Sequence, residues 1–277
     1  MVMSQQRAKK LKPLLEDLPQ GFLADAAWLT AREIDRKSIL DYERRGWLER
    51  VARSLYRRPS ESHAPPDWKT VILSMQRVMG YDVHVGGRTA LDLQGFEHYL
   101  RLGGEPLVHL YGEPPAWLKR LPDAGRYRTH TRVLFGDNPV GVQDLSVASG
   151  EARSLGAPWD WPMTVSAPER AILELLDEVP AEETFHMADV LFEGLTSARP
   201  RLLDKTLKAC RSKKVKRLFF VFADRHAHAW RKYVDPKDYD LGSGPRALTD
   251  GGRLHPLYEI TVPPDYLPAQ KDERDGS

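Results

Sequence analysis

The sequence predicts an α+β protein in which an N-terminal module of three helices and a β-hairpin precedes a larger domain of mixed helices and strands. Helical spacing of apolar residues recurs through the first 45 residues, and two short strand-like runs follow them. Helical and strand-like runs are then mixed along the rest of the chain. Because its 277 residues exceed the usual size of one domain, roughly 100–200 residues, two domains are expected.

The first module is predicted from its turn and capping residues. Its three helices and two strands are expected over Gln5–Leu18, Asp25–Leu29, about Asp35–Arg45, Trp47–Val51 and Leu55–Arg58. Asp25 is placed to cap the second helix, while Gly21 and Gly46 follow the first and third. Three helices followed by a hairpin predict a winged helix-turn-helix, with its domain over residues 1–62.

A segment rich in polar residues and proline, 60–66, separates this module from a mixed α/β domain over residues 66–263. Helices are expected there over 67–79, 89–93 and 168–178, and strands over 82–85, 107–111, 127–135, 218–222 and 257–262. Ser166 and Glu169 fit a capping box before the helix over 168–178. The charged tail, 264–277, is expected to be disordered.

Composition limits the class of protein. No apolar run reaches the roughly 18 residues that a membrane span needs, and the first ten residues lack the apolar stretch of a secretory signal. The single cysteine, Cys210, fits a reducing compartment. We therefore expect a cytoplasmic protein with no membrane partner.

Positive charge gathers in the first module although the net charge of the chain is only +2. Nine basic residues stand against five acidic ones between Arg32 and Arg58. On a helical wheel of the third helix, Ile39 and Tyr42 share one side with Leu40 on its flank. Lys37, Ser38, Asp41 and Arg45 fall on the opposite side.

Such a helix fits the major groove of double-stranded DNA, where cations donate to guanine or phosphate and a carboxylate accepts from cytosine. Arginines on the hairpin would then meet phosphates or a minor groove. The predicted DNA-binding residues are Arg36, Lys37, Ser38, Asp41, Arg44, Arg45, Arg50, Arg53, Arg57 and Arg58. A protein-docking role for the module remains an alternative.

A second basic run extends from Arg199 to Arg217, with nine basic residues and one acidic residue, Asp204. It predicts an amphipathic helix with a cationic outer face. The residues expected on this second basic surface are Lys205, Lys208, Arg211, Lys213, Lys214 and Arg217. A solvated face, a further contact to the DNA backbone, and an acidic protein or RNA partner are open alternatives.

No catalytic signature is found. The sequence has no Gly-x-Gly-x-x-Gly, no Walker-type Gly-Lys-Ser/Thr, no Gly-x-Ser-x-Gly and no His-Glu-x-x-His. His226 and His228 lack a carboxylate at a fitting spacing for a metal site, and no acidic cluster suits a nuclease. We therefore expect no catalytic residue, no metal and no cofactor; a winged-helix-targeted nuclease is the enzymatic alternative.

Several stretches, taken in order, resemble the AbiEi-type antitoxins: 21–29, 46–58, 84–91 and 166–170, followed by 241–246, 251–252 and 258–263. The resemblance covers nearly the whole chain. It implies a transcriptional autorepressor and antitoxin of a type IV toxin–antitoxin pair, of the abortive-infection kind that defends bacteria against phage. The winged helix would bind inverted repeats in the promoter of its own operon. The larger domain would oppose a nucleotidyltransferase toxin without necessarily forming a stable complex with it.

Overall fold

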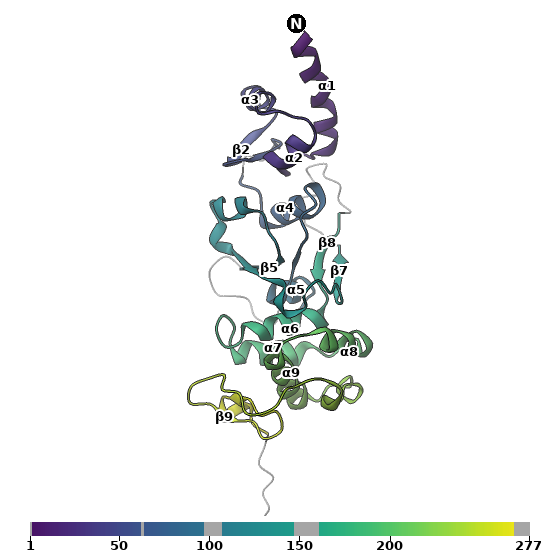
Figure 1. Cartoon of the computed structure of the whole chain (residues 1–277), viewed down its shortest axis with the longest axis vertical. Coiled ribbons are helices and arrows are strands. Elements are labelled where there is room, and N and C mark those ends of the chain that lie inside the picture. The colour runs from purple at the N-terminus through teal and green to yellow at the C-terminus, as the bar shows by residue number, and fades with distance from the viewer. Residues whose placement is uncertain (1, 62–63, 97–106, 147–160, 269–277) are drawn as a thin grey trace, which may run out of the picture. The chain divides into compact units, whose positions relative to one another are not determined.

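A computed structural model describes residues 2–61, 64–96, 107–146 and 161–268 (Figure 1). Helices and mixed sheets confirm the α+β class. The chain forms two compact units, the first made of Met1–Val85, Gly104–Thr131 and Asp144–Val165, and the second of Gly86–Gly103, Arg132–Gln143 and Ser166–Ser277. The predicted division at residues 62–66 falls inside the first unit and stays a prediction.

The N-terminal module contains three helices and a small sheet. Its elements are α1 (Val2–Asp17), β1 (Leu23–Asp25), α2 (Ala26–Ala31), α3 (Arg36–Arg44), β2 (Glu49–Ala52) and β3 (Leu55–Arg57). Asp25 caps α2 by accepting from the amide of Trp28 at 2.8 Å, and Asp35 caps α3 by accepting from the amide of Ser38 at 2.7 Å. The strands pair antiparallel in the order β1-β3-β2, which places β3 in the centre.

Apolar side chains from all three helices and the hairpin form one core in this module. Its fully or almost fully buried members include Leu14, Leu18, Leu29, Ile34, Ile39, Tyr42 and Leu48. Burying each such side chain stabilises the fold by about 1.5–3 kcal/mol before the loss of conformational entropy is counted. Ile39 and Tyr42 therefore fix which side of α3 faces inward.

The rest of the first unit is built on a mixed sheet, of which Val142, Gln143 and Ser166 are counted in the second unit. Its elements are α4 (Trp68–Leu73), a π-helical turn (Ser74–Val78), β4 (Val83–Val85), β5 (Val108–Gly112), the short 3-10 helices Ala116–Arg120 and Ala124–Arg126, β6 (Tyr127–His130), β7 (Val142–Leu145) and β8 (Met163–Ser166). The strand order is β6-β5-β4-β8-β7. β4 pairs antiparallel with β5 and parallel with β8, and β5 pairs parallel with β6. The strand expected over 127–135 ends at His130.

Hydrogen bonds attach the N-terminal module to this sheet region within the first unit. The second carboxylate oxygen of Asp25 accepts from the indole of Trp117 at 3.0 Å and from the hydroxyl of Tyr81. The indole of Trp28 donates to the carbonyl of Val78 at 2.7 Å. Burial, and secondarily the bond to Asp25, raises the pKa of Tyr81 to about 12. Helix α2 is thus held by residues far beyond the module.

The second unit is mainly helical. It contains α5 (Gly87–Leu93), a 3-10 turn (Arg132–Leu134), α6 (Pro168–Glu178), α7 (Phe185–Gly194), α8 (Pro200–Ala209), α9 (Lys213–His226), the 3-10 turns Arg231–Tyr233 and Pro236–Asp238, and the paired strands β9 (Arg253–Leu254) and β10 (Thr261–Val262). The strand expected over 218–222 is wrong, because these residues lie inside α9. These residues are buried on every side of the helix. Their apolar run is therefore continuous and shows no helical alternation of polar and apolar residues.

The expected capping box at the start of α6 is also wrong. Ala167 is the N-cap residue and makes no side-chain cap bond. The hydroxyl of Ser166 donates instead to Glu174 at 2.7 Å, and Glu169 accepts from the amide of Arg199 at 2.7 Å. Both side chains therefore bind other partners instead of the backbone amides at the start of α6.

The C-terminal segment differs in part from expectation. The strand expected over 257–262 is limited to Thr261–Val262. Pro264–Tyr266 forms a 3-10 turn, and the ring of Tyr266 lies 5.5 Å from that of Phe185. Disorder was expected for the whole tail, 264–277, of which residues 269–277 lie outside the described residues. None of the described helices has the length and apolar character to cross a membrane.

Candidate nucleic-acid interface

Helix α3 presents a charged outer face. Arg36, Lys37 and Arg44 are exposed on it, and Leu40 lies among them with 40% of its surface exposed. Because residues four apart in a helix share a face, Arg36, Leu40 and Arg44 form one row, with Lys37 beside it. The inner side carries the buried residues Ser38, Ile39 and Tyr42.

This face differs from the one that the helical wheel predicted. Ser38 is buried, and its amide is held by the cap residue Asp35. Asp41 is partly buried and forms an ion pair with Arg45 at 3.1 Å. The exposed face is therefore centred on Arg36 and Arg44 instead of on the predicted residues. This is a rotation about the helix axis of about one residue, or roughly 100°. A helical wheel shows which residues share a side of the helix. Which side faces solvent is decided by packing, here by the burial of Tyr42 in the core.

The two acidic residues within α3 are paired with arginines. Asp41 is paired with Arg45, and Glu43 binds Arg50 through two hydrogen bonds of 3.0 Å. The hydrogen bonds with Glu43 raise the pKa of Arg50, so this guanidinium stays charged.

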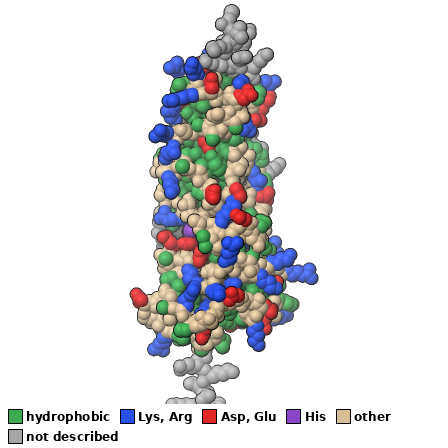
Figure 2. Space-filling view, in the orientation of Figure 1, with side chains coloured by type: hydrophobic (Ala, Val, Ile, Leu, Met, Phe, Trp, Pro, Cys, Tyr) green, Lys and Arg blue, Asp and Glu red, His purple; other side chains and the backbone are tan. Residues whose placement is uncertain are grey.

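Four exposed cations remain on this surface: Arg36, Lys37, Arg44 and Arg53. Within the described part of the chain, none of their side chains has a hydrogen-bonding or ion-pair partner. Figure 2 shows Lys and Arg side chains gathered along the edge where Figure 1 draws α3 and β2. The result is a positive surface on which both carboxylates within α3, Asp41 and Glu43, are paired with arginines.

The hairpin β2–β3 contributes a smaller part of this surface than predicted. Arg53 is exposed at its tip, next to Ser54, whose φ of +64° closes the turn. The carbonyl of Ser54 accepts from the amide of Ala26 at 3.0 Å, and that of Arg53 accepts from Arg120 at 3.0 Å. The tip is therefore held against its own unit. The hairpin has the chain position of a wing, and its role as one remains a proposal.

Arg57 and Arg58, also predicted to bind DNA, have structural partners instead. Arg57 is 4% exposed and bonds to Glu49 at 2.7 Å and to the carbonyl of Ala64 at 2.5 Å. Arg58 donates to the carbonyls of Leu15 and Leu18 at the end of α1. Arg57 is buried because β3 is the central strand of the small sheet, with covered residues along its whole length.

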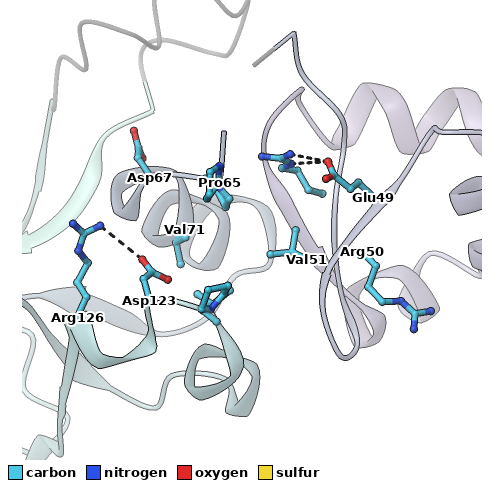
Figure 3. A pocket seen from close by; sticks show the side chains of 12 residues that line it. Glu49, Arg50, Val51, Pro65, Asp67, Val71, Asp123 and Arg126 are labelled. Carbon is cyan, nitrogen blue, oxygen red and sulfur yellow. Dashed lines mark hydrogen bonds and ion pairs between the residues drawn. The ribbon is translucent and has the colours of Figure 1, made fainter. Parts of the chain in front are cut away.

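A pocket of about 580 Å³ lies on the side of the hairpin where Arg57 is bound (Figure 3). The pair Arg57–Glu49 forms part of its wall, and Asp123 and Arg126 form another pair at 3.7 Å. The rest of the lining consists of Arg50, Asp67 and the apolar residues Val51, Val71, Leu121 and the prolines 65, 66 and 122. Arg57, which the sequence analysis predicted to bind DNA, thus stabilises the wall of this pocket.

The second basic run does not form the single amphipathic helix that was predicted. Helix α8 ends at Ala209 and α9 begins at Lys213. Lys205, Lys208 and Arg211 are exposed, as is Lys213. Lys208 forms an ion pair with Asp204 at 2.9 Å and Lys213 one with Asp240 at 3.3 Å.

Two members of the expected surface are not on an outer face. Lys214 is half-buried and donates to the carbonyls of Asp177 and Val179 at the C-terminal end of α6, and burial lowers its pKa. Arg217 is buried, and its guanidinium donates to the carbonyls of Leu241, Gly244 and Glu259 at 2.7–2.8 Å. Both cations satisfy backbone acceptors within the second unit, so the basic surface is reduced to the four exposed residues.

No metal site accompanies these surfaces in the described ranges, where no group of three or more His, Cys, Asp or Glu side chains is placed to hold an ion. His226 bonds to Asp189 at 2.7 Å and His228 to the carbonyl of Phe192 at 2.7 Å. Both histidines have structural partners.

Family comparisons give the class of protein. A model described as the N-terminal domain of the AbiEi antitoxin transcriptional regulators matches residues 7–102, and one described as the AbiEi antitoxin transcriptional regulator of type IV toxin–antitoxin systems matches residues 105–263. The protein is thus a regulatory antitoxin, a class that is not enzymatic. The chain belongs to the AbiEi antitoxin family of transcriptional regulators.

Structure comparison supports the fold alone. The crystal structure of the RV2827C protein from Mycobacterium tuberculosis is similar, with a TM-score of 0.54 at 16% sequence identity. The match covers 92% of this chain and 90% of that chain. No curated protein matches the sequence.

Proposed function

We propose that this chain represses its own operon by binding double-stranded DNA through α3 and the hairpin β2–β3. The observation that carries the proposal is the set of four exposed, unpaired cations, Arg36, Lys37, Arg44 and Arg53, in the part of the chain that the structure describes. Both carboxylates within α3, Asp41 and Glu43, are paired with arginines. An α-helix with such a face fits a major groove, and each phosphate contact releases bound counterions.

The operator is proposed to be an inverted repeat, read by two copies of the chain. The second part of the proposal is an antitoxin action that opposes a nucleotidyltransferase toxin in the cytoplasm, without a stable complex. Its support is membership of the AbiEi family. The four exposed cations of the second basic run, Lys205, Lys208, Arg211 and Lys213, are proposed as an additional surface for the DNA backbone.

Footprinting on the DNA upstream of the chain's own gene tests repression. Lys37→Ala combined with Arg44→Ala should lower the slope of log affinity against log salt by roughly 2, since each lost phosphate contact removes about 0.9. Lys232→Ala with Lys237→Ala makes the same change of charge at exposed positions of the second unit and should leave binding unchanged. Absence of protection, or an unchanged slope in the first variant, would refute DNA binding by this face.

Growth rescue tests the antitoxin part separately. Co-expression of the full chain should restore growth of cells that carry the toxin from the adjacent gene. The Lys37→Ala, Arg44→Ala variant should rescue equally well if neutralisation belongs to the larger domain. Failure of the full chain to rescue would refute opposition to that toxin while leaving DNA binding intact.

A further inference from the structure

Leu40 is an apolar side chain at the centre of the cationic face of α3. It follows Arg36 by four residues and Lys37 by three, and precedes Arg44 by four. With 40% of its surface exposed, it is one of the few large hydrophobic residues that the described part of the chain leaves open to solvent. Its neighbours in sequence, Ile39 and Asp41, are buried and partly buried.

We propose that Leu40 reads thymine, by packing against the C5-methyl group in the major groove. The inference rests on the proposed DNA binding by α3. The thymine methyl is the apolar group that a base pair offers in that groove, so it is the partner that an aliphatic side chain recognises there. The flanking cations would bind phosphates, which position the helix but carry no sequence information. Leu40 would supply the preference for thymine.

The position of Leu40 supports this role over one in packing. The core of the module closes around Ile39 and Tyr42, which are 4% and 1% exposed. Leu40 points away from them on the same outer row as Arg36 and Arg44. Contact with a methyl group would remove apolar surface from water on both partners, which favours association.

The test removes the methyl group from DNA instead of from the protein. In the DNA protected upstream of the gene, each thymine is replaced singly by deoxyuridine, which lacks only the C5-methyl group. At one thymine in each half-site, wild-type affinity should fall about fourfold, as expected for one buried methyl group. Leu40→Ala should bind thymine and uracil equally well at that position.

A second measurement adds the methyl group to another base. At the methyl-sensitive position, cytosine and 5-methylcytosine are compared. Wild-type protein should prefer 5-methylcytosine by about fourfold, and Leu40→Ala should not distinguish them. Leu254→Ala is the matched control, because Leu254 is 48% exposed and lies in the second unit; it should keep the wild-type pattern.

The outcomes separate the two proposals. If wild-type protein protects no DNA, the proposed function itself fails. If DNA is bound with the expected salt dependence but no thymine is methyl-sensitive, or the sensitivity persists in Leu40→Ala, the role of Leu40 is overturned. A uniform loss of affinity by Leu40→Ala on every sequence also overturns it. The urea midpoint of Leu40→Ala, expected to match wild type, excludes unfolding as the cause.

Discussion

Arg50 and Glu43 are joined by two hydrogen bonds, from Nε to Oε1 and from Nη2 to Oε2, each 3.0 Å long. Arg50 comes from β2 and Glu43 from the last turn of α3, so the pair joins the hairpin to the helix. The same pair removes one positive charge from the surface proposed to bind DNA. Its strength therefore influences both the geometry and the charge of that surface.

Replacing Glu43 by Gln should increase DNA affinity. The substitution releases Arg50 for a phosphate, and the slope of log affinity against log salt should become steeper by about 1. Stability should change by less than about 1 kcal/mol, because ion pairs that are partly open to solvent contribute little. Salt titration of DNA binding and urea unfolding measure the two effects. Weaker binding at unchanged stability would show that Arg50 serves only to position the hairpin.

Arg53 and Arg57 should have opposite phenotypes although they lie four residues apart. Arg57→Ala removes a buried guanidinium from Glu49 and the carbonyl of Ala64. It should cost about 1–3 kcal/mol of unfolding free energy. Arg53→Ala should leave unfolding unchanged and reduce the salt slope by about 0.9. Equal stability of the two variants would contradict the assignment of Arg57 to the pocket wall.

Glu174 is expected to be essential for folding of the second unit. This fully buried carboxylate accepts from Ser166 Oγ at 2.7 Å, Arg170 Nε at 2.8 Å and the amide of Gly87 at 2.9 Å. Glu174→Ala leaves a buried arginine without its carboxylate and should cost about 3–5 kcal/mol. Urea unfolding followed by tryptophan fluorescence measures this loss.

The exposed Glu193 of α7 provides the control for that measurement. Glu193→Ala deletes the same side chain from the same unit without removing a buried charge, and its unfolding midpoint should stay near wild type. If Glu174→Ala is equally stable, the network around Glu174 contributes little to the fold.

Cys210 should be unreactive in the folded protein. Burial raises the pKa of its thiol from 9.0 to about 11. Because the thiolate is the reactive form, this shift alone should slow its reaction with a disulfide reagent at pH 8 by about 100-fold relative to the unfolded chain. Reaction in native buffer at the rate found in urea would contradict the buried position.

The same shift has a consequence for stability at high pH. The folded state favours the protonated thiol, so its contribution is complete below pH 9 and is lost as pH rises toward about 11. Tyrosines also titrate there, so wild type must be compared with Cys210→Ala. The stability of wild type relative to this variant should decrease between pH 9 and 11. A constant difference would show that Cys210 keeps an ordinary pKa.

Local signals predicted much of the N-terminal module. The cap at Asp25, the third helix, the glycine turns and the two short strands depend on neighbouring residues, and the structure has each of them close to the expected position. Prediction was weaker where an apolar run lacked a period. Residues 218–222 were assigned to a strand for this reason, although helix α9 is buried on most sides.

The DNA-binding surface was harder to predict, because pairing of charges is a tertiary property. The sequence shows nine cations between Arg32 and Arg58, but it does not show that Glu49 is the partner of Arg57 or that the end of α1 is the partner of Arg58. Leu40 was missed because a helical wheel placed it on the flank of the packing side. Its spacing of four from both Arg36 and Arg44 was the available signal.

Asp25 limits how such regulators can be engineered. Its carboxylate accepts from Trp28 in the module and from Tyr81 and Trp117 in the sheet region. A chimera that exchanges only residues 1–59 with a relative would combine a foreign N-terminal module with the resident donors Tyr81 and Trp117, and mismatches at this buried carboxylate would destabilise the chimera. Operator preference is better transferred by grafting the outer row of α3, which leaves every contact of Asp25 in place.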